Sequence, residues 1–411
     1  MARLRIGRSY WLDAFAVKGL GRAALHGRHT ADVAIVGGGV TGCAAALMFA
    51  RAGVRAILVE SKEIGRGSTA ASTALLMQEP DTDLVDLARR YGPATARRMW
   101  RCSRGAVESI RRTLSDLHAP AVHGLPSVYY TATPQATRRL RREVELRRRA
   151  GFACRWLEAD QLRRTAGLEA AGAILTPGNA QVDPYRACLA VARGAEREGA
   201  RLFEHSKVRS IEATRDGVTL RLRGGTIHAG WAIIATGYAT PEFEPLLARF
   251  RMMNTYVIAT PRLDADTRAR VGIGDVMLWD SGRPYHYLRW TPDGRLLFGG
   301  RDAPYIAGPR RPARLRREAR HLTRELVRLY PALDGIRPEY AWEGLFATTP
   351  DGLPYIGAHP RYPRQLFALG YGGNGMTLGY FAAQVLGRMV QGRARPDDAL
   401  FGFDRGRTRR R

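Results

Sequence analysis

The sequence predicts an α/β fold in which a domain with a parallel sheet is joined to an α+β domain with an antiparallel sheet. Two observations predict the first domain: an apolar run at residues 32–36 leads directly into glycines, and a second apolar run follows at 55–60. Short apolar runs bounded by turn residues are typical of buried parallel strands. A third observation predicts the second domain, since short strand-like segments follow one another between residues 256 and 300.

The first two strands enclose a helix expected at residues 41–52, for which Gly53 is a natural stop. Such a strand–helix–strand unit should have a right-handed crossover. The other elements follow from apolar spacing and turn residues. They are helices at 81–118, 137–150, 183–200 and 376–391, a hairpin at 218–229, and strands at 231–237, 285–290 and 295–299.

These elements divide the chain into two discontinuous domains. We expect the first domain to contain residues 31–110, 155–240 and 335–395, and the second to contain residues 111–154 and 241–334. Residues 1–30 are expected to form an arm. Residues 396–411 are expected to form a basic tail that frays at 407–411.

The chain is strongly basic, with 65 basic and 38 acidic residues and a formal net charge of +27. Lysine occurs only at Lys18, Lys62 and Lys207, so almost all of the positive charge is arginine. We interpret this skew as codon bias, because the charge is spread along several helices rather than held in one block. We therefore do not expect the chain to bind nucleic acid. The alternative interpretation is that the positive charge binds RNA or an anionic membrane surface.

The chain contains no run of 18 apolar residues, so no transmembrane segment is expected. Its basic first thirty residues lack the continuous apolar stretch of a secretory signal. The cysteines Cys43, Cys102, Cys154 and Cys188 are far apart and form no metal-binding or redox motif. These features favour a cytoplasmic protein without a metal site, with attachment to the inner face of the membrane as an alternative location.

The residues after the first strand match the pattern G-x-G-x-x-G, with Gly37, Gly39 and Gly42 at the glycine positions. Gly37 permits a tight turn, Gly39 lets a pyrophosphate approach the backbone, and Gly42 lets helix and strand pack closely. The helix that begins near Val40 and Thr41 would direct free N–H groups at the phosphates. Because the pattern lies between a strand and a helix, it predicts a Rossmann-type dinucleotide site.

An acidic residue and a loop follow the second strand. Glu60 is placed to bind the ribose hydroxyls and would repel a 2′-phosphate, which argues against NADP. Residues 61–73 are rich in glycine and hydroxyl groups and can wrap an extended dinucleotide, whereas a plain NAD dehydrogenase would start a helix here. We therefore predict FAD. The expected contacts from this loop are Ser61, Arg66, Gly67, Ser68, Ser72 and Thr73.

This loop and the fingerprint together resemble the superfamily of D-amino-acid oxidase, sarcosine oxidase and glycine oxidase. Three further segments match in the family's order: Ala235, Thr236 and Gly237, then residues 342–357, then a glycine-rich turn at 370–376. The resemblance runs from residue 30 or so to residue 392. It implies a Rossmann-type FAD-binding domain with a second, antiparallel-sheet substrate domain, and a backbone contact from Val208 to adenine.

The glycine-rich turn at 370–376 precedes the last helix, and a helix N-terminus stabilises negative charge. Reduced flavin carries such charge near N1 and the C2 carbonyl. We therefore expect the turn to contact FAD through Gly372, Gly373, Asn374, Gly375, Met376 and Thr377. Residues 65–73 lack the histidine that some relatives link covalently to flavin, so the FAD should be non-covalent.

The sequence contains no second strand–glycine–helix unit for NAD(P)H, so electrons should come from an organic substrate. The resemblance implies hydride transfer to flavin N5 from a small primary or secondary amine or an N-substituted amino acid. Phe346 stands where the family's amino-acid oxidases carry a carboxylate-binding arginine. No lysine follows Lys207, whereas sarcosine oxidases use a lysine to speed reaction with O2. The electron acceptor therefore stays open between O2, a quinone and a carrier protein.

Candidate substrate-side residues lie in the second sheet. They are Tyr256, His286, Tyr287, Arg289 and Arg301. Strand alternation should place Tyr285, Tyr287 and Arg289 on one face of the sheet and His286 on the other. These groups would orient the substrate or clamp a carboxylate, and ordinary sheet packing is the alternative. Two other functions stay open: a tRNA-modifying amine oxidase, and a flavin-binding assembly protein without turnover.

Overall fold

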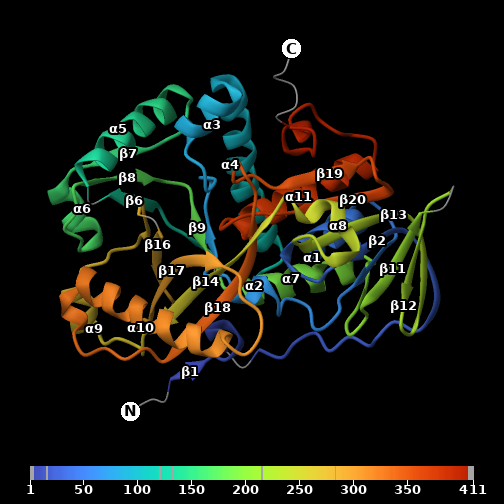
Figure 1. Ribbon diagram of the computed structural model, residues 1–411, viewed down its shortest axis with the longest axis horizontal. Coiled ribbons are helices and arrows are strands. Elements are labelled where there is room, and N and C mark those ends of the chain that lie inside the picture. Colours follow the sequence, from blue (N-terminus) through green and yellow to red (C-terminus); the bar gives the residue numbers. More distant parts are fainter. Residues whose placement is uncertain are drawn as a thin grey trace.

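The computed structural model describes residues 4–14, 17–119, 122–131, 133–213, 216–282 and 284–405. Two large sheets lie side by side and helices cover them (Figure 1). The first sheet carries the predicted strand–helix–strand unit, and the second is largely antiparallel. The predicted α/β class with a second sheet domain is confirmed.

The first sheet has a parallel core in the order β10 (Arg201–Phe203), β3 (Ala56–Val59), β2 (Gly27–Val36) and β13 (Gly225–Gly237). The start of β13 pairs antiparallel with β12 (Val218–Leu222), as the predicted hairpin requires. The end of β13 pairs in parallel with β20 (Tyr362–Leu369). The sheet is completed by β11 (Val208–Ala213), next to β12, and by β19 (Tyr355–His359), next to β20.

Over this sheet, α1 (Val40–Arg51) packs against both α7 (Pro184–Arg197) and α11 (Gly375–Val390). A fourth, α4 (Pro93–Asp116), packs on α11. Their buried apolar side chains form one core cluster with those of β2 and β3. Because β2 and β20 run in the same direction, the turns that lead into α1 and α11 meet at one edge of the sheet.

The second sheet has the order β1 (Arg5–Ile6), β18 (Tyr340–Thr348), β14 (Arg251–Ala259), β17 (Leu296–Pro304), β16 (His286–Trp290), β15 (Met277–Asp280), β6 (Ser127–Thr131), β8 (Gly172–Thr176) and β7 (Arg155–Leu157). Its pairs are antiparallel except β1 with β18 and β15 with β6. The long helix α10 (Arg311–Leu329) packs on β14, β17 and β18, and its leucines join Phe298 in a second core. One face of β14, β17 and β18 is therefore covered by α10.

Further helices and a small sheet complete the fold. The helices are α2 (Ser68–Ala71), α3 (Leu84–Tyr91), α5 (Pro134–Arg149), α6 (Ala159–Ala166), α8 (Glu244–Leu247) and α9 (Ala265–Val271). The strands are β4 (Leu75–Leu76), β9 (Ala180–Gln181) and β5 (His123–Gly124), which form a small sheet in the order β4-β9-β5. The helix expected at 81–118 is two helices, because Gly92 has φ 85° and ends α3.

The expected domain boundaries were wrong in three places. Residues 155–176, expected in the first domain, contain β7 and β8, which pair with β6 in the second sheet. Residues 340–348, also expected in the first domain, form β18, because their backbone pairs with the whole length of β14. Residues 111–116, expected in the second domain, continue α4 and pack with the first.

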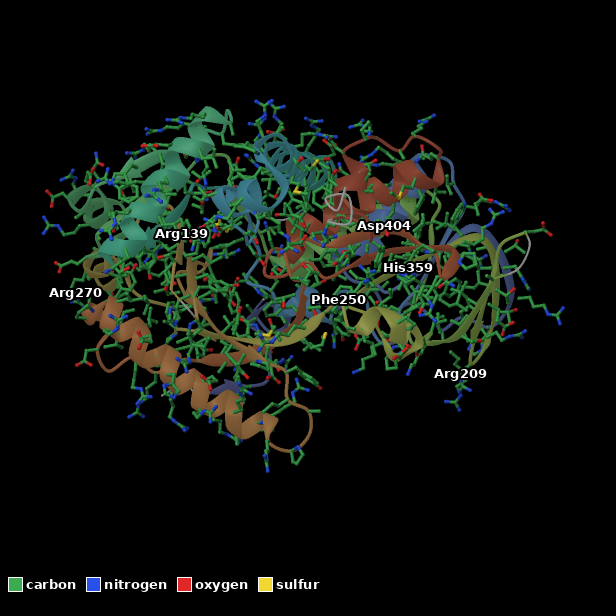
Figure 2. All side chains as sticks on the ribbon, turned by 45° about the horizontal axis from the view of Figure 1, so that its top comes forward. Arg139, Arg209, Phe250, Arg270, His359 and Asp404 are labelled. Carbon is green, nitrogen blue, oxygen red and sulfur yellow. The ribbon has the colours of Figure 1, made fainter. Side chains whose placement is uncertain are left out.

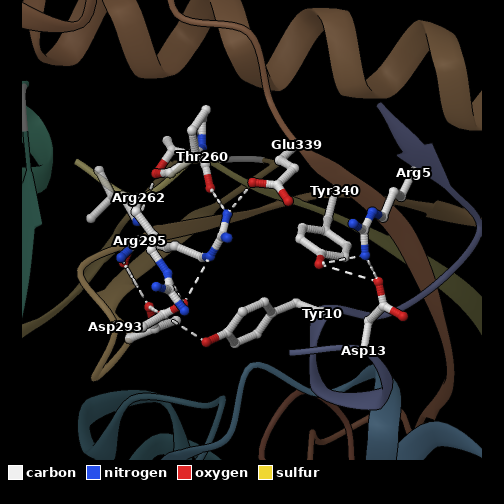
Figure 3. Close-up of polar contacts among 12 residues, drawn as sticks. Arg5, Tyr10, Asp13, Thr260, Arg262, Asp293, Arg295, Glu339 and Tyr340 are labelled. Carbon is white, nitrogen blue, oxygen red and sulfur yellow. Dashed lines mark hydrogen bonds and ion pairs between the residues drawn. The ribbon is translucent and has the colours of Figure 1, made fainter. Parts of the chain in front are cut away.

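The expected N-terminal arm is docked on the second sheet. Figure 3 shows the polar contacts that hold it: the Tyr10 hydroxyl donates to Asp293, Arg5 pairs with Asp13, and Tyr340 donates to the same carboxylate. The Tyr10 ring is fully buried. The arm is therefore part of the folded core rather than a free extension, and residues 27–30 already belong to β2.

The expected basic tail is also packed as far as residue 405. Asp398 is buried and paired with Arg388, and Phe401 and Phe403 lie in the core. Arg405 forms a two-pronged ion pair with Asp351, at 2.7 and 3.0 Å, with both side chains 3% exposed. Residues 407–411, for which fraying was expected, lie outside the described residues.

The positive charge is spread over the outside of both domains (Figure 2). Arg209, on β11, and Arg270, on α9, are both exposed and lie far apart. No helix among the described residues is both long and apolar enough to cross a membrane. The same part of the chain contains no group of His, Cys, Asp and Glu side chains that could hold a metal ion.

Candidate active site

The turn between β2 and α1 requires glycine for steric reasons. Gly37 has φ 111°, and a Cβ there would lie 2.6 Å from the Ala235 carbonyl oxygen. A Cβ on Gly42 would lie 1.9 Å from the Gly37 carbonyl oxygen. A Cβ on Gly39 would meet only the Thr69 hydroxyl, at 3.2 Å, because its other sides face a cavity. The turn therefore leaves room for a group to lie against the backbone at Gly39.

The start of α1 is open for an anion. Gly39 is the N-cap residue and offers no side-chain cap. The Val40 N–H donates to the Thr69 hydroxyl oxygen at 3.1 Å. A helix N-terminus presents unsatisfied N–H groups and positive potential, which suits a pyrophosphate.

Glu60 lies at the end of β3 on the same side. One of its carboxylate oxygens accepts from the Gly38 N–H at 2.7 Å, and the other accepts from the Lys62 N–H at 2.8 Å and the Ser61 hydroxyl at 2.9 Å. These bonds fix the carboxylate in the cavity wall. A carboxylate can accept about four hydrogen bonds, so the oxygen that binds Gly38 keeps one lone pair for a ribose hydroxyl.

The cavity next to this turn, the small cavity, has a volume of about 530 Å³. Most residues predicted to contact FAD line it. They are Gly37, Gly39, Val40, Thr41, Glu60, Ser61, Arg66, Gly67, Ser68, Ser72, Val208, Ala235, Thr236, Gly237, Gly375 and Met376. Gly42 lies behind the wall, and Thr377 is fully buried and lines no cavity described here.

A second cavity, the large cavity, has a volume of about 1000 Å³ and is lined by both domains. Thr73, Gly372, Gly373 and Asn374 line it rather than the small cavity. The two cavities share wall residues, namely Ser68, Ser72, Gly237, Tyr238, Tyr371, Gly375 and Met376. An extended dinucleotide therefore has space to pass from the Gly37–Gly42 turn to the start of α11. The glycine cradle, the open helix end and the carboxylate at Glu60 all fit FAD.

The turn before α11 is held by hydrogen bonds to the segment 77–81. The Asn374 amide donates to the carbonyls of Met77 and Glu79, at 2.9 and 3.0 Å. The Gly373 N–H donates to Asp81. These bonds tie the start of α11 to the 77–81 segment, which forms another wall of the large cavity.

Tyr287 is the predicted substrate-side residue that lines the large cavity. Its hydroxyl lies 2.9 Å from the Thr255 hydroxyl, and burial together with Asp302 raises the pKa of this phenol. Tyr285 lies beside it, with ring centroids 5.8 Å apart. The two tyrosines and Thr255 therefore form one polar-aromatic wall on the second sheet.

Arg289 does not reach the large cavity, although it shares a face with Tyr287. Its guanidinium is buried and donates to three carbonyls, those of Thr73, Ala74 and Val182, at 2.9, 3.0 and 2.9 Å. Burial lowers its pKa to about 9. A group bound to three backbone carbonyls is not available to clamp a substrate. Arg289 instead holds the end of the 61–73 loop.

His286, Tyr256 and Arg301 were also expected near the substrate, and the structure does not bring them there. His286 lies 3.0 Å from Asp280 and stacks on Phe298, on the opposite face of the sheet. Tyr256 is 1% exposed and packs in the core under α10. Arg301 pairs with Glu318 of α10. Strand alternation explains the correction for Tyr256, because on β14 it is Met253 and Thr255 that face the cavity.

Several cavity residues were missed by the sequence analysis. Tyr129 and Trp279 stack with ring centroids 3.6 Å apart and form part of the wall. Asp81 and Asp302 add carboxylates, and Phe346 lines the same cavity. These residues lie on segments far apart in the chain, and no local motif connects them. In the sequence, Phe346 stands out only because it occupies the position of the family's carboxylate-binding arginine.

Known proteins resemble the chain over nearly its whole length. The family model described as FAD dependent oxidoreductase (DAO) matches residues 32–389. Gamma-glutamylputrescine oxidoreductase of Escherichia coli (strain K12) is 28% identical over 391 residues, which cover 93% of this chain and 89% of that protein. Glycine oxidase of Bacillus licheniformis is 27% identical over 88% of this chain and 93% of that protein.

Solved structures share the fold. The crystal structure of glycine oxidase from Geobacillus kaustophilus has a TM-score of 0.74 at 23% identity and covers 91% of this chain and 98% of that one. The crystal structure of L-proline dehydrogenase from P. horikoshii has a TM-score of 0.77 at 17% identity and covers 91% of this chain and 97% of that one. The overall fold is thus common to these proteins and to this chain.

Proposed function

Since the chain belongs to the DAO family of FAD-dependent oxidoreductases, we propose that it oxidises a small primary or secondary amine, or an N-substituted amino acid, at the carbon next to nitrogen. Its relatives support this proposal, since gamma-glutamylputrescine oxidoreductase and glycine oxidase are named for substrates that contain such a carbon. When bound, FAD supplies the hydride acceptor at N5.

The observation that carries the proposal is the connection between the two cavities. The small cavity has the features that hold a dinucleotide, and it shares the wall residues Gly237, Gly375 and Met376 with the large cavity. A molecule in the large cavity would thus meet the end of an FAD that extends from the small one. The large cavity has enough volume for a complete organic substrate, since ligand pockets are typically about 300–1,000 Å³.

The chain's own residues would hold FAD and orient the substrate. Gly39 and the N-terminus of α1 would receive the pyrophosphate, and Glu60 the ribose. Tyr287, fixed by Thr255, would orient the substrate from the second sheet. Only a neutral amine can release a hydride, and partial burial in the cavity lowers an amine's pKa.

Phe346 supports an amine over a simple amino acid. It lines the large cavity at the position where the family's amino-acid oxidases carry a carboxylate-binding arginine. An apolar ring there cannot bind an α-carboxylate. We therefore expect a secondary amine or a larger N-substituted amino acid rather than a simple amino acid as the substrate, and O2, a quinone or a carrier protein as the electron acceptor.

The test is anaerobic reduction of the bound flavin. The purified protein should be yellow and should lose its visible absorbance when mixed with one of a panel of amines, while alcohols of the same carbon skeleton leave it unchanged. The Gly39→Val variant, made without bound flavin, controls for absorbance from other sources. A wild-type flavin that dithionite reduces but no amine bleaches would contradict an amine-oxidising function and favour a binding role without turnover.

A further inference from the structure

We propose that four buried side chains, which lie outside both cavities, position the loop that receives the flavin half of FAD. They are Ser9 and Trp11 from the N-terminal arm and Arg289 and Trp342 from the second sheet. These four residues are called the loop clamp below. They serve cofactor binding, a step that comes before the proposed oxidation of an amine.

The loop clamp binds five consecutive backbone carbonyls, those of residues 70–74. Each carbonyl accepts a hydrogen bond from one of the four side chains, and Arg289 binds the last two. In the order of the carbonyls, the donors are Ser9 at 2.5 Å, Trp342 at 2.9 Å, Trp11 at 2.8 Å and Arg289 at 2.9 and 3.0 Å. Most carbonyls in proteins bind backbone N–H groups, so this run of side-chain donors holds a segment that its own backbone does not hold.

The direction of these carbonyls decides which way the N–H groups of the loop point. In a trans peptide the C=O group and the following N–H group point in opposite directions. The Ser72 carbonyl points to Trp11, so the Thr73 N–H points away from it. Thr73 lines the large cavity, and its N–H has no hydrogen-bond acceptor among the described residues. Since Ser72 lines both cavities, this donor is available to a flavin that extends from the small cavity.

The end of the loop has a strained backbone that its contacts maintain. Ala74 has φ 55°, in the left-handed region that residues other than glycine rarely adopt. Its carbonyl accepts from Arg289 and from the Val182 N–H, at 3.0 and 3.3 Å. Its own N–H donates to the Ser72 hydroxyl at 3.0 Å. Such a conformation persists only where the surrounding structure enforces it, so the loop should relax when the clamp is weakened.

The two parts of the loop clamp support each other. The Arg289 guanidinium carbon lies 5.1 Å from the centre of the Trp11 ring. The arm that carries Trp11 is itself fixed to the second sheet, because the Tyr10 hydroxyl donates to Asp293 at 2.7 Å. The arm and the second sheet therefore act on the loop as one unit, and the docked arm has a role in holding the cofactor.

The groups expected to hold the other half of FAD are separate from the loop clamp. Gly39, the start of α1 and Glu60 line the small cavity, and no clamp residue forms a hydrogen bond with them. ADP carries the adenosine and pyrophosphate groups of FAD without the flavin. Its binding should therefore be insensitive to the clamp, whereas the binding of FAD should depend on it.

The test is the affinity of the flavin-free protein for FAD and for ADP, measured by titration calorimetry. Trp11→Phe and Trp342→Phe each keep an aromatic ring and remove one N–H donor. Each should weaken FAD binding about tenfold, because a buried carbonyl loses its partner and the relaxed loop must be ordered again on binding. The affinity for ADP should change by less than about twofold.

The control is Trp290→Phe, which removes an indole N–H that donates to the Ile273 carbonyl at 3.1 Å. Trp290 follows Arg289 on β16 and lines neither cavity, so this variant should keep both affinities. Equal losses of FAD and ADP affinity in Trp11→Phe would show a general structural role and overturn the inference. An unchanged FAD affinity in both clamp variants would overturn it as well.

A second measurement needs no variant. In the wild-type protein, hydrogen exchange in peptides that cover residues 70–76 should slow when FAD is added and stay unchanged when ADP is added. Equal protection by the two ligands would contradict the inference even if the variants fail to fold. Neither measurement uses an amine, so a clamp that behaves as expected in a protein that no amine reduces would refute only the proposed function. Amine-dependent bleaching together with wild-type FAD affinity in both clamp variants would refute only the role of the clamp.

Discussion

Adding one methyl group at Gly42 should destabilise the fold itself, whereas the same change at Gly39 should affect only cofactor binding. In Gly42→Ala the new Cβ would lie 1.9 Å from the Gly37 carbonyl oxygen and 3.1 Å from its carbon. Ordinary contact needs about 3.4 Å or more, so α1 and the end of β2 would have to separate by about 1.5 Å. Both neighbours are backbone, and neither can turn away as a side chain would.

The expected magnitude follows from these contacts. Overpacking a core costs about 1–3 kcal/mol, and we expect the upper end because the clash is between main-chain segments. The alanine recovers at most about 1 kcal/mol of helix propensity, which leaves a net loss of about 2 kcal/mol. In Gly39→Ala the Cβ meets only the Thr69 hydroxyl at 3.2 Å, so the stability of the flavin-free protein should change by less than about 0.5 kcal/mol.

The assay is urea unfolding of the flavin-free proteins, together with the ratio of flavin to protein after purification. Gly105→Ala, in α4, is the matched control, because its Cβ would meet nothing within 4 Å. It should raise stability by up to about 1 kcal/mol and leave flavin content unchanged. Gly39→Ala should lower flavin content with an unchanged urea midpoint. A Gly42→Ala protein with wild-type midpoint and full flavin content would refute the steric argument.

Three further predictions concern single side chains. Glu60→Gln should weaken FAD binding about tenfold in equilibrium dialysis without releasing all of it, because one charged acceptor of the ribose is lost; unchanged affinity would mean that another group binds the ribose. Burial opposes ionisation of Asp351, yet Arg405 lowers its pKa to about 2, so this pair should add about 2 kcal/mol of stability above pH 4 that is lost as the pH falls toward 2. The Arg405→Met variant should therefore unfold at higher pH than the wild type in acid titrations followed by tryptophan fluorescence, and coincident curves would count against the pair. Tyr287→Phe removes the contact to Thr255 and should lower kcat/KM for the amine about tenfold while flavin content stays unchanged; equal kinetics would exclude a role in orienting the substrate.

The cofactor side of the site could be predicted from sequence because its requirements are local. Gly37, Gly39 and Gly42 lie within one turn, and their spacing alone fixes which backbone atoms come close. Glu60 follows from the end of the next strand. The family resemblance then placed the turn before α11 beside them, and the two turns do line adjoining cavities.

The substrate side could not be predicted in the same way. Tyr129 and Trp279 meet because β6 pairs with β15, and no local pattern specifies that pairing. Tyr256 lies on a strand of the expected kind, but the face it occupies depends on α10, which covers that side. Arg289 lies on the predicted face of its strand, the face of Tyr287. Only its hydrogen bonds to three backbone carbonyls show that it holds the fold together rather than binding substrate.

Another contact could not be predicted because its two residues are far apart in the sequence. Cys43 and Cys188 are 145 residues apart in sequence, yet their sulfur atoms lie 3.7 Å apart behind the glycine turn. Their positions within α1 and α7 give no sign of this contact. It follows from the packing of the two helices, which the sequence pattern does not determine.

The position of β20 in the first sheet has a consequence for how the protein matures. This strand pairs with the end of β13 and leads directly into α11. The small cavity therefore lacks the wall formed by Gly375 and Met376 until residue 376 has been made. A growing polypeptide that has already released β2, α1 and β3 from the ribosome would offer only the sites for the pyrophosphate and the ribose. Acquisition of the coenzyme should therefore come late, after synthesis of nearly the entire chain.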